Sequence, residues 1–210
     1  MKVSEEIIRR LSNYRRVLYK LKSLGFIKVF SDNLGDALGI SPTQVRKDFA
    51  MFKITGKKKG GYEVEEILQR LNTILGKDKI QNVVVVGCGK MGRALMNYNG
   101  FSAEGMKVIA AFDSDPSMID PHARIPILDL AELPNITKEH GVKVAIMTVP
   151  ESNAPQLIDA LEGAGIKGIL NFAPIELKSR GNCRIHNISI LLELENMIYF
   201  VNNLDDMIEL

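Results

Sequence analysis

The amino-terminal third of the chain has an apolar pattern with helical spacing. Apolar residues recur every three or four positions and predict a helix that begins after Ser4 and ends at Gly25. These positions are Ile7, Leu11, Tyr14, Leu18 and Leu21. Arginines occupy the other sides of this helix, where solvent and a phosphate backbone are alternative surroundings.

A short strand at residues 27–30 and two further helices predict a helix-turn-helix. The first helix, residues 31–38, ends before a glycine-containing turn. The second begins after Ser41, which is a strong helix cap, and Gln44 stands in the position of a capping box.

The helix after Ser41 has one apolar side and one polar side. Val45, Phe49 and Phe52 share the apolar side at about 100° per residue. Short and cationic side chains on the polar side can reach base edges in a major groove. We assign Ser41, Thr43, Gln44, Arg46 and Lys47 to DNA contact, together with Arg10, Tyr14 and Arg16 of the first helix. A solvated helix in a small bundle is the alternative.

Residues 54–62 predict a cationic wing after this helix. Lys57, Lys58 and Lys59 stand between glycines, in a segment that can form a hairpin and enter a minor groove. We assign all three lysines to DNA contact; a flexible linker is the alternative. A helix at residues 63–75 completes a winged helix-turn-helix domain over residues 1–78.

Four consecutive valines at residues 83–86 predict a buried parallel strand. The glycine-rich loop that follows allows a tight turn, close approach to a pyrophosphate and close helix packing. A second strand, residues 108–112, ends at Asp113, whose carboxylate accepts from ribose hydroxyls and repels a 2′-phosphate, so NAD is favoured over NADP. We assign Gly87, Cys88, Gly89, Lys90, Met91, Gly92 and Asp113 to cofactor binding. A loop that serves only as a turn is the alternative.

The rest of the chain predicts an α/β fold with a doubly wound parallel sheet, a Rossmann-like domain over residues 79–189. Strands at residues 125–127, 142–149 and 166–172 alternate with helices at residues 92–99, 129–133 and 156–164. Ligands bind such sheets where the strands end. We therefore add Thr148, Val149, Pro150, Asn171, Phe172, Ala173 and Pro174 to the cofactor site. The three histidines lie away from these strand ends, so no catalytic residue is assigned.

Residues 190–210 form a third part, an apolar segment with helical spacing. A terminal helix of this composition needs a partner surface. That surface belongs either to its own domain or to a second subunit, with which the helix is exchanged in a dimer.

Charge divides the chain into a basic and an acidic part. Residues 1–79 hold 17 Lys and Arg against 9 Asp and Glu, whereas residues 80–210 hold 10 against 16. Basic surface is typical of nucleic-acid binding, although a solvated face is the alternative. Cys88 and Cys183 have no metal-ligand or dithiol spacing, so no metal site is expected. No apolar stretch suits a membrane span or a signal peptide, which indicates a cytoplasmic protein without a membrane partner.

The order of these parts resembles the Rex family of bacterial redox-sensing transcriptional repressors. The motifs that carry the resemblance lie at residues 41–48, 62–67, 92–95, 97–98, 100–101, 112–116, 148–150 and 168–174. The resemblance implies a homodimer that binds a palindromic operator in double-stranded DNA when the NADH/NAD⁺ ratio is low. NADH binding then releases the operator, so NADH and NAD⁺ are sensed and not consumed.

The resemblance further implies that the terminal helix is exchanged between subunits and that Tyr98 lies near the nicotinamide. In the family an aspartate before that helix alternates between an arginine and a tyrosine, which Arg16 and Tyr98 match. Ser189 stands in the aspartate's place and cannot form the ion pair. Cys88 and Lys90 replace the family's usual alanine and asparagine, and lysines replace arginine in the wing.

Two other functions stay open from the residues alone. One is a small NAD-dependent dehydrogenase or CoA-binding-type domain whose basic part serves only for assembly. The other is a repressor that binds NAD permanently as a structural ligand.

Overall fold

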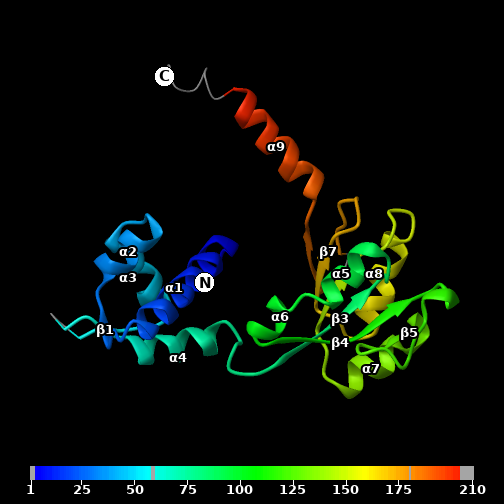
Figure 1. Ribbon diagram of the computed structural model, residues 1–210, viewed down its shortest axis with the longest axis horizontal. Helices are drawn as coiled ribbons and strands as arrows, with labels where there is room; N and C mark the ends of the chain where they lie inside the picture. The colour runs from blue at the N-terminus through cyan, green and yellow to red at the C-terminus, as the bar shows by residue number, and fades with distance from the viewer. Residues whose placement is uncertain (1–2, 58–59, 180, 204–210) are drawn as a thin grey trace. The chain divides into compact units, whose positions relative to one another are not determined.

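The computed structural model describes residues 3–57, 60–179 and 181–203. The chain divides into two compact units, Met1–Ile80 and Gln81–Leu210, each with its own apolar core (Figure 1). The division falls two residues beyond the predicted boundary, at the start of a strand.

Unit 1 is a small helical domain with a two-stranded sheet. Its elements are α1 (Glu5–Ser23), β1 (Lys28–Val29), α2 (Ser31–Leu38), α3 (Pro42–Met51), β2 (Tyr62–Glu63) and α4 (Val64–Ile74). Ser4 Oγ accepts a hydrogen bond from the Ile7 amide at 3.4 Å, and Ser41 Oγ accepts one from the Gln44 amide at 3.2 Å. The two predicted helix starts are therefore confirmed. The ring of Phe49 lies edge-on to those of Tyr14 and Tyr62 in the core.

A short hairpin follows α3, as predicted for a wing. Lys57 and Gly61 form an antiparallel bridge in which the Lys57 amide donates to the Gly61 carbonyl at 2.9 Å. The chain then enters β2, which pairs antiparallel with β1. Lys58 and Lys59, which the sequence places inside this hairpin, lie outside the described residues.

Unit 2 is built on a parallel sheet with strand order β5-β4-β3-β6-β7-β8 in the described part of the chain. The strands are β3 (Gln81–Val86), β4 (Met106–Asp113), β5 (Ile127–Asp129), β6 (Val144–Met147), β7 (Gly168–Asn171) and β8 (Arg184–Asn187). The helices are α5 (Lys90–Met96), α6 (Gly100–Ala103), α7 (Leu133–Glu139), α8 (Ala154–Gly163) and α9 (Ile190–Asn202), with 3₁₀ turns η1 (Pro116–Met118) and η2 (Leu130–Glu132). The predicted doubly wound α/β fold is confirmed.

Helices cover both faces of this sheet. Val84 and Phe112 point to the face that α7 and α8 cover, where they pack with Leu161. Val83 and Val85 point to the opposite face, where they pack with Met96 of α5. The four valines of β3 are buried on both sides, which explains why the run is apolar without alternation.

In the described part of the chain, four elements were not predicted: β8, α6, α7 and the 3₁₀ turn η1, because the helix predicted at residues 129–133 corresponds to η2. β8 is an edge strand in which Ile185 is half-buried and the other three residues are exposed, so its sequence has no apolar run. α6 has four residues, too few for a helical period. The predicted strands at residues 142–149 and 166–172 are longer than β6 and β7, because the apolar residues that flank both strands are buried outside the ladder.

α9 has no buried residue, although it is predominantly apolar. Its exposed large side chains are Ile190, Leu191, Leu192, Leu194, Met197, Ile198, Tyr199, Phe200 and Val201. An apolar surface of this extent marks an interaction site. The segment after Asn203, which was predicted to continue the helix to residue 210, lies outside the described residues.

Candidate functional site

The glycine loop after β3 packs against the end of β6. Gly87 has φ +96°, and a Cβ on it would lie 2.8 Å from the Thr148 backbone. Thr148 Oγ1 donates to the Gly87 carbonyl at 2.7 Å. A Cβ on Gly92 would overlap the Gly87 carbonyl oxygen and lie 2.9 Å from Thr148 Oγ1. Glycine at both positions therefore lets the loop, the start of α5 and β6 meet without an intervening side chain.

The carboxylate of Asp113 is hydrogen-bonded to the backbone of this loop. Asp113 ends β4, and its Oδ2 accepts a hydrogen bond from the Cys88 amide at 2.7 Å. Its Oδ1 accepts from the Asp115 amide at 3.0 Å. These two bonds fix the carboxylate beside the glycine loop, and each oxygen keeps a lone pair for a further donor.

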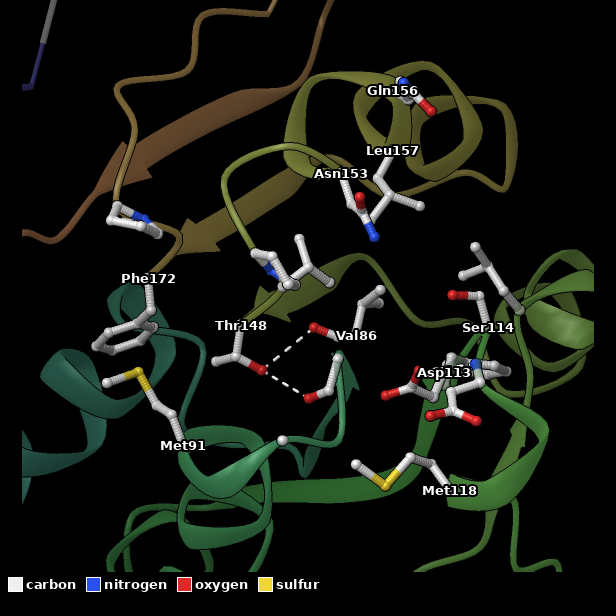
Figure 2. A pocket seen from close by; sticks show the side chains of 18 residues that line it. Val86, Met91, Asp113, Ser114, Met118, Thr148, Asn153, Gln156, Leu157 and Phe172 are labelled. Atoms are coloured by element: carbon white, nitrogen blue, oxygen red, sulfur yellow. Dashed lines mark hydrogen bonds between the residues drawn. The ribbon is translucent and has the colours of Figure 1, made fainter.

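A cavity of about 720 Å³ lies between these elements (Figure 2). Its volume is that of a typical small-molecule site, which spans roughly 300–1,000 Å³. Figure 2 shows Asp113 and Ser114 on one side of the cavity, and Met91 and Phe172 on the other. The lining residues are Val86, Gly87, Gly89, Met91, Phe112, Asp113, Ser114, Asp115, Met118, Leu130, Thr148, Val149, Pro150, Asn153, Gln156, Leu157, Phe172 and Pro174.

The structure brings most of the predicted cofactor residues to this cavity. Gly87, Gly89, Met91, Asp113, Thr148, Val149, Pro150, Phe172 and Pro174 line it. Gly92 lies behind the loop as a packing residue. Lys90 and Tyr98 are exposed and lie outside the cavity lining.

Three other predicted cofactor residues, Cys88, Asn171 and Ala173, have buried side chains and do not line the cavity. Cys88 is buried with its thiol toward the Phe112 carbonyl. Asn171 is fully buried and hydrogen-bonded within the protein, and Ala173 is 4% exposed. Each lies in a segment that borders the cavity, but sequence position does not say which side chains of a turn face the cavity.

Burial raises the pKa of the Cys88 thiol to about 11, and the negative charge of Asp113 adds to the effect. A raised pKa disfavours the thiolate, which is the reactive species, so this thiol is poorly suited to redox chemistry. Cys88 fits the loop as a small buried residue.

Several lining residues were missed by sequence reasoning. Asn153, Gln156 and Leu157 belong to the turn before α8 and to the first turn of that helix. In a parallel α/β unit this turn lies on the rim where strands end, so their position after β6 was a usable signal. Met118 belongs to the 3₁₀ turn η1 after β4, and Leu130 belongs to η2 after β5; no sequence pattern at either position indicates a ligand.

A buried carboxylate organises the candidate DNA-binding surface of unit 1. Asp48 of α3 is 1% exposed and accepts from Arg10 Nε at 2.7 Å and from Arg10 Nη2 at 2.8 Å. Tyr14 Oη donates to it at 2.9 Å and Gln44 Nε2 at 2.8 Å. Burial by itself raises the pKa of Asp48, but the hydrogen bonds from Arg10, Tyr14 and Gln44 outweigh it and hold the pKa below its usual value.

This network corrects two predicted DNA contacts. Tyr14 is fully buried, so its side chain is not available to DNA. The Arg10 guanidinium is occupied by Asp48 and by Glu6, whose carboxylate lies 2.7 Å from Nη1. Both side chains instead link α1 to α3 through their hydrogen bonds to Asp48.

The other residues of α3 that were predicted to contact DNA lie at or near the exposed side of the helix. Arg46 donates to Ser31 Oγ at 2.9 Å and to Thr43 Oγ1 at 3.1 Å, which ties its guanidinium to the start of α2. Lys47 and Arg16 are exposed, and their side chains make no hydrogen bond or ion pair among the described residues. Lys57 of the wing lies 3.7 Å from Glu63.

Within the described residues, no helix is long and apolar enough to cross a membrane. The same residues hold no cluster of three or more His, Cys, Asp or Glu side chains placed to bind a metal ion.

Together, the fold and the two sites define a two-domain regulator, in which a DNA-binding-type helix-turn-helix is joined to a nucleotide-binding-type α/β unit. Family comparison agrees: the model described as "Putative DNA-binding protein N-terminus" matches residues 2–50, and the model "CoA binding domain" matches residues 78–175. The redox-sensing transcriptional repressor Rex of Listeria welshimeri is 37% identical over 203 residues, which cover 96% of this chain and 94% of that protein. The Rex protein of Thermosipho africanus is 36% identical over 199 residues, which cover 94% and 95%.

Solved structures extend this likeness over the full length. The crystal structure of RSP, a Rex-family repressor, matches with a TM-score of 0.85 and 30% identity, covering 100% of this chain and 98% of that one. The structure of RSP in complex with β-NAD⁺ and operator DNA matches with a TM-score of 0.88 and 30% identity, covering 100% and 96%. The chain belongs to the Rex family of redox-sensing transcriptional repressors. It is a regulator and not an enzyme, which rules out the dehydrogenase alternative.

Proposed function

We propose that this repressor binds NADH and NAD⁺ in the cavity of unit 2 and senses their ratio. The observation that carries the proposal is the Asp113 carboxylate, held beside the glycine loop by the Cys88 amide at 2.7 Å. In this position it can accept hydrogen bonds from both ribose hydroxyls of the adenosine. The backbone of the loop can then approach the pyrophosphate, because Gly87 and Gly89 have no side chain.

Unit 1 supplies the proposed operator contacts. Ser41, Thr43, Gln44, Arg46 and Lys47 lie at the start of α3, the part of a recognition helix that reaches base edges. Lys57 and the two lysines after it are proposed to contact the minor groove. Arg16 is proposed to contact a phosphate. Because these residues are proposed to bind DNA, the proposed location of the protein is the cytoplasm, where a bacterial chromosome lies.

The proposed functional form is a homodimer joined by α9, which covers its apolar surface on a second subunit. A palindromic operator then presents one half-site to each unit 1. Occupancy by NADH is proposed to favour a dimer with lower operator affinity, and NAD⁺ one with higher affinity. The free energy by which NADH weakens operator binding equals the difference in NADH binding free energy between the two forms of the dimer, the one with high and the one with low operator affinity.

Fluorescence anisotropy with a labelled palindromic operator tests this function. We expect tight binding that NADH weakens more than NAD⁺ does, and a Lys47→Ala variant that binds more weakly with a salt slope reduced by about one. Lys138→Ala, an exposed lysine of unit 2, is the matched control. Equal operator binding with and without either nucleotide would contradict the sensing role. If the nucleotide were a permanent structural ligand, it would not exchange with added NADH.

Coenzyme A is a second candidate ligand, because residues 78–175 match the CoA-binding model. CoA carries a 3′-phosphate on the adenosine ribose, which the Asp113 carboxylate would repel. We therefore expect NADH to bind in competition with NAD⁺ and not to be displaced by equimolar CoA. Displacement by CoA would reverse this assignment.

A further inference from the structure

A pair of asparagines joins the rim of the cavity to the strand that leads into α9. Asn171 ends β7, Asn187 ends β8, and the two residues are paired in register. Asn171 Nδ2 donates to Asn187 Oδ1 at 2.9 Å and to the Ile175 carbonyl at 2.8 Å. The Asn171 side chain is fully buried, so these bonds are costly to break without replacement.

On one side, this pair supports the cavity. Asn171 Oδ1 accepts from the Ala173 amide at 2.9 Å and so shapes the turn on which Phe172 and Pro174 stand. Those two residues line the cavity, and Phe172 faces it in Figure 2. A ligand that displaces Phe172 therefore acts directly on the backbone next to Asn171.

On the other side, the pair holds the start of α9. The Ile188 amide donates to the Asn171 carbonyl at 2.8 Å, and Ser189 Oγ caps α9 by accepting from the Leu192 amide at 3.1 Å. Asn187 exchanges two hydrogen bonds with the Leu177 backbone, both at 3.0 Å. Because α9 has no buried residue, its direction from the sheet depends on this end of β8.

We propose that Asn171 and Asn187 are positioning residues that transmit occupancy of the nucleotide cavity to α9. This inference rests on the proposed function, since α9 changes operator affinity only if it joins two subunits. When a nucleotide moves the turn at Phe172, the bonds from Asn171 to Asn187 and Ile188 move the start of α9 with it. Neither asparagine side chain lines the cavity, so the pair governs the response to the nucleotide and not the affinity for it.

The test uses the full-length protein and its Asn187→Ala variant. NADH affinity is measured by nucleotide fluorescence, and operator affinity by anisotropy with and without saturating NADH. We expect the NADH Kd to change by less than about threefold, while the ratio of operator Kd with and without NADH falls by about fivefold or more, within the usual range of coupling between sites. Retained NADH binding also shows that unit 2 of the variant is folded.

Two further variants separate coupling from stability. Asn187→Asp keeps an acceptor for Asn171 Nδ2 and the Leu177 amide, so it should retain most of the response. Asn82→Ala removes a comparable bond, from Asn82 Nδ2 to the His140 carbonyl at 3.1 Å, near the amino end of β3. It should leave the response unchanged.

An Asn187→Ala protein with the full wild-type response would overturn the inference. Parallel loss of NADH affinity would also overturn it, because the residue would then belong to the binding site. A wild-type protein that does not respond to NADH would refute the proposed function first, and this inference with it.

Discussion

Gly92 packs so closely beneath the glycine loop that a Cβ atom on it would overlap the carbonyl oxygen of Gly87. The obstructing atom belongs to the backbone of a residue that is itself held by Thr148, so it has no free path to move. The relationship therefore links the stability of unit 2 to the shape of its nucleotide site.

Gly92→Ala should lower the stability of unit 2 by about 2 kcal/mol through overpacking. Displacement of the loop should also weaken NADH binding by about tenfold or more, equivalent to about 1.4 kcal/mol. Thermal unfolding and nucleotide fluorescence measure the two effects. Gly163→Ala is the control, because a Cβ there meets nothing within 4 Å, and it should stabilise α8 by about 0.5 kcal/mol. Normal NADH binding by Gly92→Ala would contradict the role of this packing.

Asp113→Asn should reduce the preference of the site for NADH over NADPH. The carboxylate repels a 2′-phosphate, whereas an asparagine keeps an oxygen that can accept from the Cys88 amide. We expect the ratio of the two Kd values to narrow by about tenfold, mainly through tighter NADPH binding. Isothermal titration with both nucleotides measures it. Asp129→Asn, which alters a carboxylate outside the cavity lining, should leave the ratio unchanged.

Protonation of Asp48 should make the free energy of unfolding of unit 1 depend on pH in the acid range. Its pKa in the folded state lies below the ordinary value of 3.8, so its contribution to the free energy of unfolding is present above about pH 4. That contribution is lost as pH falls through the folded pKa. Urea unfolding should therefore show a decline in stability below pH 4.

Asp48→Asn should cost about 3 kcal/mol at pH 7, since it leaves the Arg10 charge without its buried partner. The variant should also lose less stability than the wild type on acidification. Asp36→Asn changes an exposed carboxylate of α2 and should alter neither quantity. An acid profile shared by wild type and Asp48→Asn would exclude Asp48 as its source.

Lys53→Gly should stabilise unit 1 by about 1 kcal/mol. Lys53 follows α3 with φ +55°, a left-handed conformation that is unfavourable for a residue with a side chain. Lys53→Ala is the matched control, because it removes the amine but keeps the strain, and it should not be stabilised. Equal unfolding midpoints for the glycine and alanine variants would show that strain at this position is negligible.

Ser189→Asp should increase the response of operator binding to NADH. An aspartate still caps α9 as Ser189 does, through the Leu192 amide at 3.1 Å, and it adds the charge that the resemblance to the family requires. Operator titrations at several NADH/NAD⁺ ratios measure the response. Ser189→Ala, which loses the cap at a cost of about 1 kcal/mol, is the control and should gain no response. If Ser189→Asp behaves as the wild type, the family's switch does not explain this protein.

Local patterns in the sequence were sufficient for the fold and for the centre of the nucleotide site. The valines of β3, the glycines after it and Asp113 follow one another at spacings that only a parallel strand, a tight turn and a second strand satisfy. Ser4 and Ser41 likewise predicted two helix starts, because a capping side chain binds amides within three residues along the chain.

Side-chain direction could not be obtained in this way. The helical spacing placed Tyr14 on the apolar side of its helix, but no local pattern indicated that Arg10 of the same helix is held by Asp48, 38 residues away. β8 was not predicted because an edge strand needs few apolar residues. Its position in the sheet results from its pairing with β7.

The sequence by itself determined the two modules, their charges and the residues that can approach a dinucleotide, because these depend on composition and on neighbours along the chain. Only the tertiary structure decided that Cys88 and Asn171 face inward, that Asp48 gathers four donor atoms from three side chains, and that Asn187 meets the cavity rim. These relationships join residues far apart in the chain. Their energies depend on burial and hydrogen-bond geometry, which arise only when the strands and helices are packed.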